Sequence, residues 1–264
     1  MNDTFSPQRF GWLLKKTILE KSIQILGLTG LSLIISLIIY AIIKNIVGFE
    51  QGQVMSFIVG FVVGGTFLAS LVFNYFSSNS SGSSYLTLPA SHFEKWLCGI
   101  LIAGVLFPFI FLCFYHFMDL VFISLYHKGL DPKEAFYKEK YNAVFPFSMR
   151  SFIAIKAIIM YVNFSGAMLI GSLYFNKGSF IKVALIGCGL IVGSVFINFF
   201  IAKSILTNVD WALPYYCAFI NVGKERGKLL LPETASLTVD ICLMYIIPAI
   251  LWLTPLVRLR EKEF

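Results

Sequence analysis

Three polar side chains lie inside otherwise apolar stretches of the sequence and could do chemistry there. His116 and Asp119 are three residues apart, which places them on one face of a helix. Lys156 lies at a similar depth in the next apolar stretch. Charge is costly in hydrocarbon, so ionisable groups in membrane spans usually pair with one another or mark a pathway. We predict that Asp119 pairs with Lys156; the alternative is that each side chain reaches the lipid headgroups independently.

The pair of His116 and Asp119 could instead relay protons or help to bind a metal ion. The chain has only three histidines, and no third ligand lies near this pair in the sequence, so we expect no metal site. The chain contains no HExxH and no Gly-x-Ser-x-Gly stretch, and Gly223–Lys228 lacks the spacing of a phosphate-binding loop. We therefore expect that this chain is not an enzyme and does not hydrolyse ATP by that route.

The elements that must position these side chains follow from the composition. Of 264 residues, 58% are apolar and 13% are charged, whereas soluble domains carry about 45–50% and about 25%. This imbalance excludes a soluble enzyme, a disordered protein and a secreted disulfide scaffold, and indicates a polytopic membrane protein. The net charge of +7 fits basic residues beside anionic headgroups, so membrane lipids are the expected partners and nucleic acid is not.

Six apolar segments are long enough to cross a bilayer core, which takes about 20 helical residues. Unbroken apolar runs favour helices over barrel strands, in which apolar and polar residues alternate. The predicted fold is an all-α polytopic membrane protein, with one transmembrane domain over residues 1–264. Its expected spans are 24–48, 53–76, 97–126, 151–175, 180–203 and 239–257.

Glycines and prolines within these spans indicate where helices approach or bend. Gly60 and Gly64, and likewise Gly189 and Gly193, have the four-residue spacing that lets two membrane helices come close. The alternative is that glycine is simply common in membrane helices. We expect three prolines to kink or end their spans: Pro108, Pro248 and Pro255.

Charge near the chain ends gives an orientation. Both ends are basic, and an even number of crossings puts them on one side, which the positive-inside rule makes the cytoplasm. The loops 127–150 and 204–238 are then external, although they also carry many cations, so the assignment depends on the first span dominating.

Two segments on the expected cytoplasmic side have helical signals. Residues 5–22 read as an amphipathic helix lying on the inner leaflet, or alternatively as an extension of the first span. In the loop 77–96, Ser91 can cap a helix and Glu94, three residues later, completes a capping box. A helix should therefore start near residue 91 and run towards the third span.

This loop carries a family resemblance. Leu88-Pro89-Ala90-Ser91 followed by Glu94-Lys95 resembles the intracellular loop of permease subunits of bacterial type-2 ATP-binding-cassette (ABC) exporters. The helix before the first span, the six crossings, the length and the long segment before the last span are also similar to that family. The resemblance implies that the loop 77–96 is a coupling helix that docks on an ATPase subunit, with five candidate contacts: Leu88, Pro89, Ser91, Glu94 and Lys95.

The same resemblance implies the cofactors, the partner subunits and the cellular location of the transporter. ATP and Mg²⁺ would bind to the separate ATPase subunit, and this chain would itself hold no cofactor. It would form a homodimer, or a heterodimer with a paralogous permease, in the bacterial cytoplasmic (inner) membrane. The substrate expected for an aromatic-rich, weakly charged bundle is hydrophobic or amphiphilic. The alternatives are a non-transporting membrane subunit of a larger complex and a proton-coupled carrier that uses His116 and Asp119.

The two outer segments are expected to lie at the membrane surface. Asp131 as a cap, followed by Pro132 and Glu134, predicts a short surface helix in which Tyr137 and Tyr141 share a face. The segment 204–238 mixes short apolar stretches with Gly and Pro, which favours a pair of short re-entrant or interfacial helices before the last span.

Overall fold

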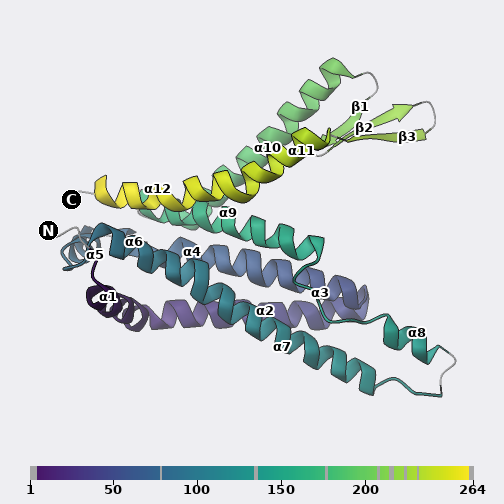
Figure 1. The fold of residues 1–264 in the computed structure, drawn as a ribbon, viewed down its shortest axis with the longest axis horizontal. Coiled ribbons are helices and arrows are strands. Elements are labelled where there is room, and N and C mark those ends of the chain that lie inside the picture. Colours follow the sequence, from purple (N-terminus) through teal and green to yellow (C-terminus); the bar gives the residue numbers. More distant parts are fainter. Residues whose placement is uncertain are drawn as a thin grey trace.

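Six helical rods dominate the fold. The computed structural model describes residues 5–77, 79–133, 136–175, 178–206, 209–213, 217–222, 225–230 and 232–261. Within these ranges, six rods are long and apolar enough to cross a membrane: Ser22–Ile46, Phe49–Val72, His92–Lys128, Phe152–Tyr174, Ser179–Ile205 and Glu233–Glu261. The protein is therefore an all-α polytopic membrane protein in its architecture, and every rod overlaps the span expected for it. Both ends of the chain lie at the same end of the bundle (Figure 1).

The rods are built from the following elements. The first span is α2 (Ser22–Ile46), the fourth is α9 (Phe152–Tyr174) and the fifth is α10 (Ser179–Ile205). The other three are composite: α3 (Phe49–Phe57), η1 (Ile58–Gly64) and α4 (Gly65–Val72); α6 (His92–Ile100), η3 (Leu101–Leu106) and α7 (Phe107–Lys128); and α11 (Glu233–Ile241), η4 (Cys242–Ile246) and α12 (Ile247–Glu261). Outside the spans lie α1 (Pro7–Glu20), η2 (Asn74–Ser77), α5 (Asn79–Leu86) and α8 (Tyr137–Asn142).

Two of the prolines expected to bend their spans follow wider, π-helical turns. The π segment η3 ends two residues before Pro108, and η4 ends two residues before Pro248. A proline has no N–H to donate, and its ring collides with the carbonyl four residues earlier, so the regular hydrogen-bond ladder must rearrange there. Pro255, in contrast, lies inside α12.

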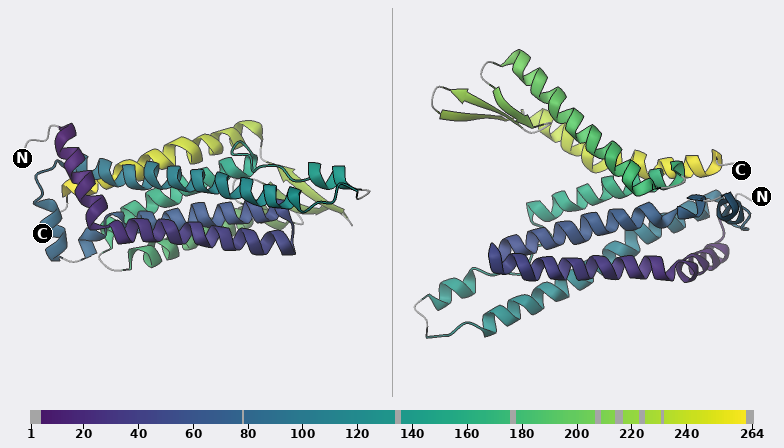
Figure 2. Two further views of the ribbon diagram at one scale, coloured as in Figure 1. Left: turned by 90° about the horizontal axis from the view of Figure 1, so that it is seen from below. Right: turned by 180° about the vertical axis from the view of Figure 1, so that it is seen from behind.

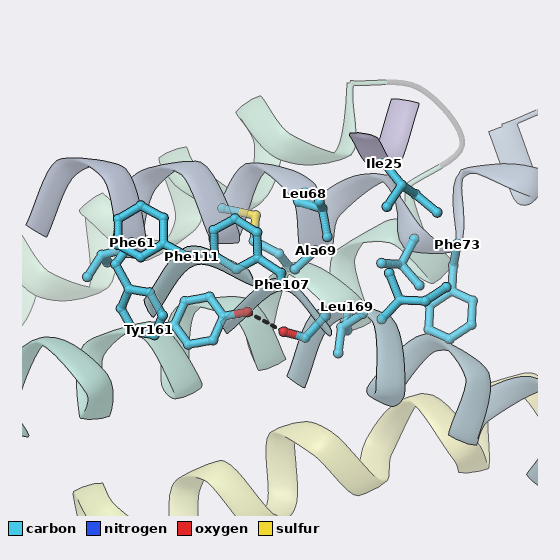
Figure 3. Packing of buried hydrophobic residues seen from close by; sticks show 14 of the residues in the cluster. Ile25, Phe61, Leu68, Ala69, Phe73, Phe107, Phe111, Tyr161 and Leu169 are labelled. Carbon is cyan, nitrogen blue, oxygen red and sulfur yellow. Dashed lines mark hydrogen bonds between the residues drawn. The ribbon is translucent and has the colours of Figure 1, made fainter. Parts of the chain in front are cut away.

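Aromatic rings fill the centre of the bundle where the second, third and fourth spans meet (Figure 3). The ring of Phe61 lies 4.5 Å from that of Tyr161 and 5.4 Å from that of Phe111, measured between centroids. The Tyr161 hydroxyl donates a hydrogen bond to the carbonyl of Ala103 in η3. A methyl group at Gly65 would come within 2.4 Å of Tyr161, so these rings need a glycine there.

One of the two glycine pairs is a helix contact. A methyl group on Gly64 would lie 2.4 Å from the Cβ of Ser32, and one on Gly60 would lie 2.7 Å from the Cβ of Ser36. The expected close approach is therefore confirmed between η1 and α2. At Gly189 and Gly193 a methyl group would meet nothing within 4 Å. No residue of α10 is buried, and this helix leans away from α2 and α7 (Figure 1).

Polar side chains join the last span to the rest of the bundle. The Trp252 indole donates to the carbonyl of Val162 at 2.8 Å, and the Trp96 indole donates to the carbonyl of Trp252 at 2.8 Å. The amide of Asn163 donates to the carbonyl of Leu243 at 2.9 Å. Because an N–H without an acceptor inside a bundle is costly, these bonds fix how α6 and α9 meet η4 and α12.

The expectation of short helices in 204–238 is wrong. That segment contains an antiparallel sheet in the order β1-β2-β3: Val209–Leu213, Cys217–Val222 and Glu225–Leu230. The physical reason is that β1 and β2 are short and rich in aromatic and β-branched residues, which suit a pleated surface. An apolar run of this length does not distinguish a strand from a helix by itself.

The surface helix in the loop 127–150 begins later than expected. The amide of Lys133 donates to the Asp131 side chain at 3.0 Å, so Asp131 forms a turn. Helix α8 starts at Tyr137, which makes the expected start at 132 wrong, while Glu134 lies outside the described residues. The rings of Tyr137 and Tyr141 share a face of α8, with centroids 5.9 Å apart.

Candidate functional site

Helix α1 lies across the end of the bundle that holds both termini (Figure 2). The chain turns at Lys21, whose φ of −104° and ψ of 20° separate α1 from α2. Leu13 and Thr17 face inwards and are buried, whereas Trp12 and Leu19 are 71% and 64% exposed. A crosswise helix whose exposed side mixes large apolar side chains with Lys15 and Lys16 is the arrangement expected for a segment at a membrane surface.

The capping box expected in the loop 77–96 is confirmed. The Ser91 hydroxyl accepts a hydrogen bond from the Glu94 amide at 3.2 Å, and the Glu94 carboxylate accepts one from the Ser91 amide at 2.9 Å. The two bonds satisfy donors that the first turn of α6 would otherwise leave without partners. Helix α6 begins at His92 and continues without a break through η3 into α7.

The same carboxylate also holds α1, which the sequence analysis did not foresee. Its Oε1 atom accepts the Ser6 amide at 2.8 Å and an Arg9 guanidinium nitrogen at 3.1 Å. Ser6 directly precedes α1, and the Glu94 side chain is fully buried. One carboxylate therefore fixes the starts of two helices that are far apart in the sequence, α1 and α6.

Lys95 and Lys21 cap the carboxyl ends of two other helices nearby. The buried Lys95 ammonium donates to the Leu86 carbonyl at the end of α5, at 2.8 Å. The Lys21 ammonium donates to the carbonyls of Leu71 and Val72 at the end of α4, at 3.2 and 3.1 Å. A cation at a helix C-terminus stabilises carbonyls that have no partner within the helix.

Lys21 is itself enclosed by the bend. Its ammonium lies 3.5 Å from the centroid of the Tyr75 ring. Burial, which disfavours the charged form, lowers the pKa of Lys21 to about 8.

The five candidate docking residues divide into two groups. Ser91, Glu94 and Lys95 are buried and shape the loop from inside, so their side chains offer no surface to another protein. Leu88 is half-buried and Pro89 is exposed. The docking role itself stays a prediction, and Leu88 and Pro89 are the two candidates that could make direct contact.

At the opposite end of the bundle, the Asp119 carboxylate is buried among neutral donors. It accepts the Tyr40 hydroxyl at 2.6 Å, the Gln53 amide at 2.9 Å and the backbone N–H of Phe147 at 2.7 Å. The Gln53 amide also donates to the Phe145 carbonyl at 2.9 Å. These bonds tie the segment just before α9 to α2, α3 and α7.

The expected pair of Asp119 and Lys156 is wrong. The Lys156 ammonium instead lies 2.9 Å from the Asp240 carboxylate of α11, and both of these side chains are partly exposed. The physical reason is the direction in which the side chains point. Similar depth placed Asp119 and Lys156 at one level, but Asp119 faces α2 and α3 whereas Lys156 faces the last span.

His116 and Asp119 do not form a joint site either. Asp119 is 1% exposed, whereas His116 is exposed on the outside of α7. Three donors already occupy the carboxylate, which gives a proton relay through this pair no geometric support. Within the part of the chain that the structure describes, no three His, Cys, Asp or Glu side chains gather in a way that could hold a metal ion.

Comparisons with known proteins add no family. The chain matches no family model, no curated protein and no solved structure. The function must therefore be argued from the fold and from the residues described above.

Proposed function

We propose that this chain is the membrane-spanning permease subunit of an ABC exporter that works with a separate ATPase subunit. Its place would be the bacterial cytoplasmic membrane, with both termini in the cytoplasm. Two copies, or one copy and a paralogous permease, would enclose the pathway. ATP and Mg²⁺ would bind to the ATPase, and the substrate would be hydrophobic or amphiphilic.

The observation that carries this proposal is the double role of Glu94. Its carboxylate joins the crosswise helix α1 to the start of α6, at the end of the bundle where both termini lie. The loop between the second and third spans is thus braced against the rest of that end. A braced loop can transmit a push, whereas a flexible loop would absorb it.

The proposed coupling follows from this brace. When ATP binding closes the ATPase pair, it presses on Leu88 and Pro89, which precede α6. The third span is one continuous rod from His92 to Lys128, so movement at its start reaches the outer end. Helix α1 moves with it because Arg9 and Ser6 are bonded to the same carboxylate.

Affinity purification of the chain from its native membrane in a mild detergent tests this proposal. We expect an ATPase with a phosphate-binding loop to co-purify. Pro89→Asp should reduce its recovery by at least about tenfold, because a charge placed in a docking contact costs more than about 1.4 kcal/mol. The matched control, Lys138→Asp in the exposed helix α8, should leave recovery unchanged. If the chain yields no ATPase, the proposal fails and a non-transporting membrane subunit becomes the better interpretation. If both variants recover the ATPase equally well, docking at Pro89 is wrong.

A further inference from the structure

A groove of about 310 Å³ runs between α1 and the segment just before α6. One wall is formed by α1, with Arg9, Trp12 and Lys16, and the other is formed by Leu88 and Pro89. Specific small-molecule sites have volumes of about 300 Å³ and more. The groove is therefore large enough for a phosphate headgroup and the glycerol next to it.

The α1 wall is a single helix face. Arg9, Trp12 and Lys16 are spaced i, i+3 and i+7, which places them one above the other along two turns. Lys15 does not line the groove, although it is exposed like Lys16. The helix thus directs two cations and one aromatic ring into the groove.

The groove carries an excess of positive charge. Within the described part of the chain, no carboxylate lines it. The nearby buried Glu94 forms an ion pair with Arg9, so the excess positive charge comes from Lys16. Lys16 has no ion-pair partner among the residues that the structure describes. A groove of this charge is complementary to an anion.

The surroundings of the groove indicate where the anion comes from. Trp12 and Leu19 are large apolar side chains on the exposed side of α1, and tryptophan favours the headgroup layer of membranes. Cations beside such a helix attract anionic lipids of the adjacent leaflet. Trp12 provides an apolar wall for the upper part of an acyl chain.

We propose that this groove binds the headgroup phosphate of an anionic phospholipid, held by Arg9 and Lys16 between α1 and the loop before α6. This inference depends on the placement of α1 at the cytoplasmic leaflet in the proposed function. A bound lipid would add a second connection between α1 and the loop beside Glu94. The coupling of the loop to the spans would then depend on the anionic lipid content of the membrane.

Quenching of Trp12 fluorescence by brominated lipids tests the site directly. The full chain is placed in phosphatidylcholine nanodiscs that contain increasing fractions of brominated phosphatidylglycerol or, separately, of brominated phosphatidylcholine. The chain has four tryptophans, so the signal of Trp12→Phe is subtracted to leave that of Trp12. We expect phosphatidylglycerol to quench at a several-fold lower fraction than phosphatidylcholine does.

Two variants that each remove one positive charge distinguish a specific lipid site from general attraction of anionic lipids to a basic protein. Lys16→Gln should weaken the preference for phosphatidylglycerol by about fivefold, the equivalent of about 1 kcal/mol per cation. Lys138→Gln, in the exposed helix α8 at the far end of the bundle, should change it by less than about twofold, because charges much farther than about 8 Å are screened at physiological ionic strength. Equal quenching by both lipids, or equal losses in the two variants, would overturn the proposal.

The assay also separates this inference from the proposed function. It contains no ATPase, so a lipid preference that depends on Lys16 cannot come from a protein partner in the groove. If the preference is absent but Pro89→Asp still releases an ATPase, the lipid site is wrong and the permease proposal stands. If the lipid preference is present and no ATPase is recovered, the permease proposal is wrong, while the site remains.

Discussion

At the scale of single residues, Asp119 shows how a carboxylate is kept inside this bundle without a cation. A hydroxyl, a side-chain amide and a backbone amide each donate to it. Hydrogen bonds to a charged acceptor are stronger than those to a neutral one, and removing the acceptor leaves buried donors without partners. Asp119 is thus a structural centre that attaches the segment before α9 to three helices.

Asp119→Asn should therefore destabilise the protein. The amide that replaces one carboxylate oxygen is a donor, and it faces donors on either side, so we expect a loss of about 2–3 kcal/mol. Thermal unfolding in detergent measures this loss, and the backbone amide of Phe147 should exchange its hydrogen faster. His116→Asn is the control, because His116 is exposed one turn away. Equal melting temperatures for the two variants would contradict the role given to Asp119.

Lys21 predicts a pH dependence of stability. Burial lowers its pKa to about 8 from an ordinary value of 10.5. Between these pH values the unfolded chain retains a proton that the folded chain has released, so stability should rise with pH in that window. Burial raises the pKa of Tyr75, which acts in the opposite direction above pH 10. Unfolding in urea between pH 7.5 and about 10 should show this rise in the wild type and less of it in Lys21→Met; an identical slope in both would count against it.

The polar residues were only partly predictable from the sequence. The capping box was predictable because Ser91 and Glu94 are close in sequence and their spacing alone defines the motif. The partners of Asp119 were not, because Tyr40, Gln53 and the backbone of Phe147 come from three distant segments. The position of a residue along its span can be predicted from the sequence. The neighbour that its side chain faces cannot, because it depends on which helices pack together.

At the scale of elements, Glu94 connects two helices, and its two functions can be separated. Gln also serves in capping boxes, so Glu94→Gln should keep the start of α6 and weaken the contacts with Ser6 and Arg9, which share the other oxygen. Glu94→Ala should lose both. Because a lost cap costs about 1–2 kcal/mol, we expect the Ser6 and Ser91 amides of Glu94→Ala to exchange roughly tenfold faster. Unchanged exchange at Ser6 would show that α1 is held by other contacts.

The two glycine pairs give a matched comparison between elements. Gly64→Val should push α2 away from the second span, because Ser32 occupies the space that the new side chain needs. Overpacking of this kind costs about 1–3 kcal/mol. Gly189→Val, in a region where nothing lies within 4 Å, should leave the thermal stability of the monomer nearly unchanged. A similar loss in both variants would contradict the packing described for η1 and α2.

Long elements were predicted well and short ones were not. The six spans lie where apolar runs exceed the thickness of a bilayer, because length alone decides this. The sheet over Val209–Leu230 was missed, although Gly223-Lys224 between two short runs favours a two-residue hairpin. The pairing of Val222 with Glu225 leaves room for two residues. Asp131 was predicted to cap a helix, but it forms a turn, and α8 begins only at Tyr137.

At the scale of the whole molecule, the helices are held together at one end of the bundle, here called the braced end, and diverge at the other end. Both termini, α1 and the start of α6 meet at the braced end, whereas α10 and the sheet lean away from the other spans (Figure 1). The fifth span buries none of its residues within this chain. Lipid or another membrane subunit must cover such a helix, and in the proposed permease dimer the second copy could do so.

Site-specific photo-cross-linking tests the central claim most directly, namely that the braced end is where an ATPase docks. A photo-reactive amino acid is placed at position 89 in one variant and at position 138, in the exposed helix α8, in the other. After irradiation of the native membrane, position 89 should form a cross-link to a protein with a phosphate-binding loop, and position 138 should not. A cross-link to such a protein from position 138 alone, or from neither position, would contradict the account.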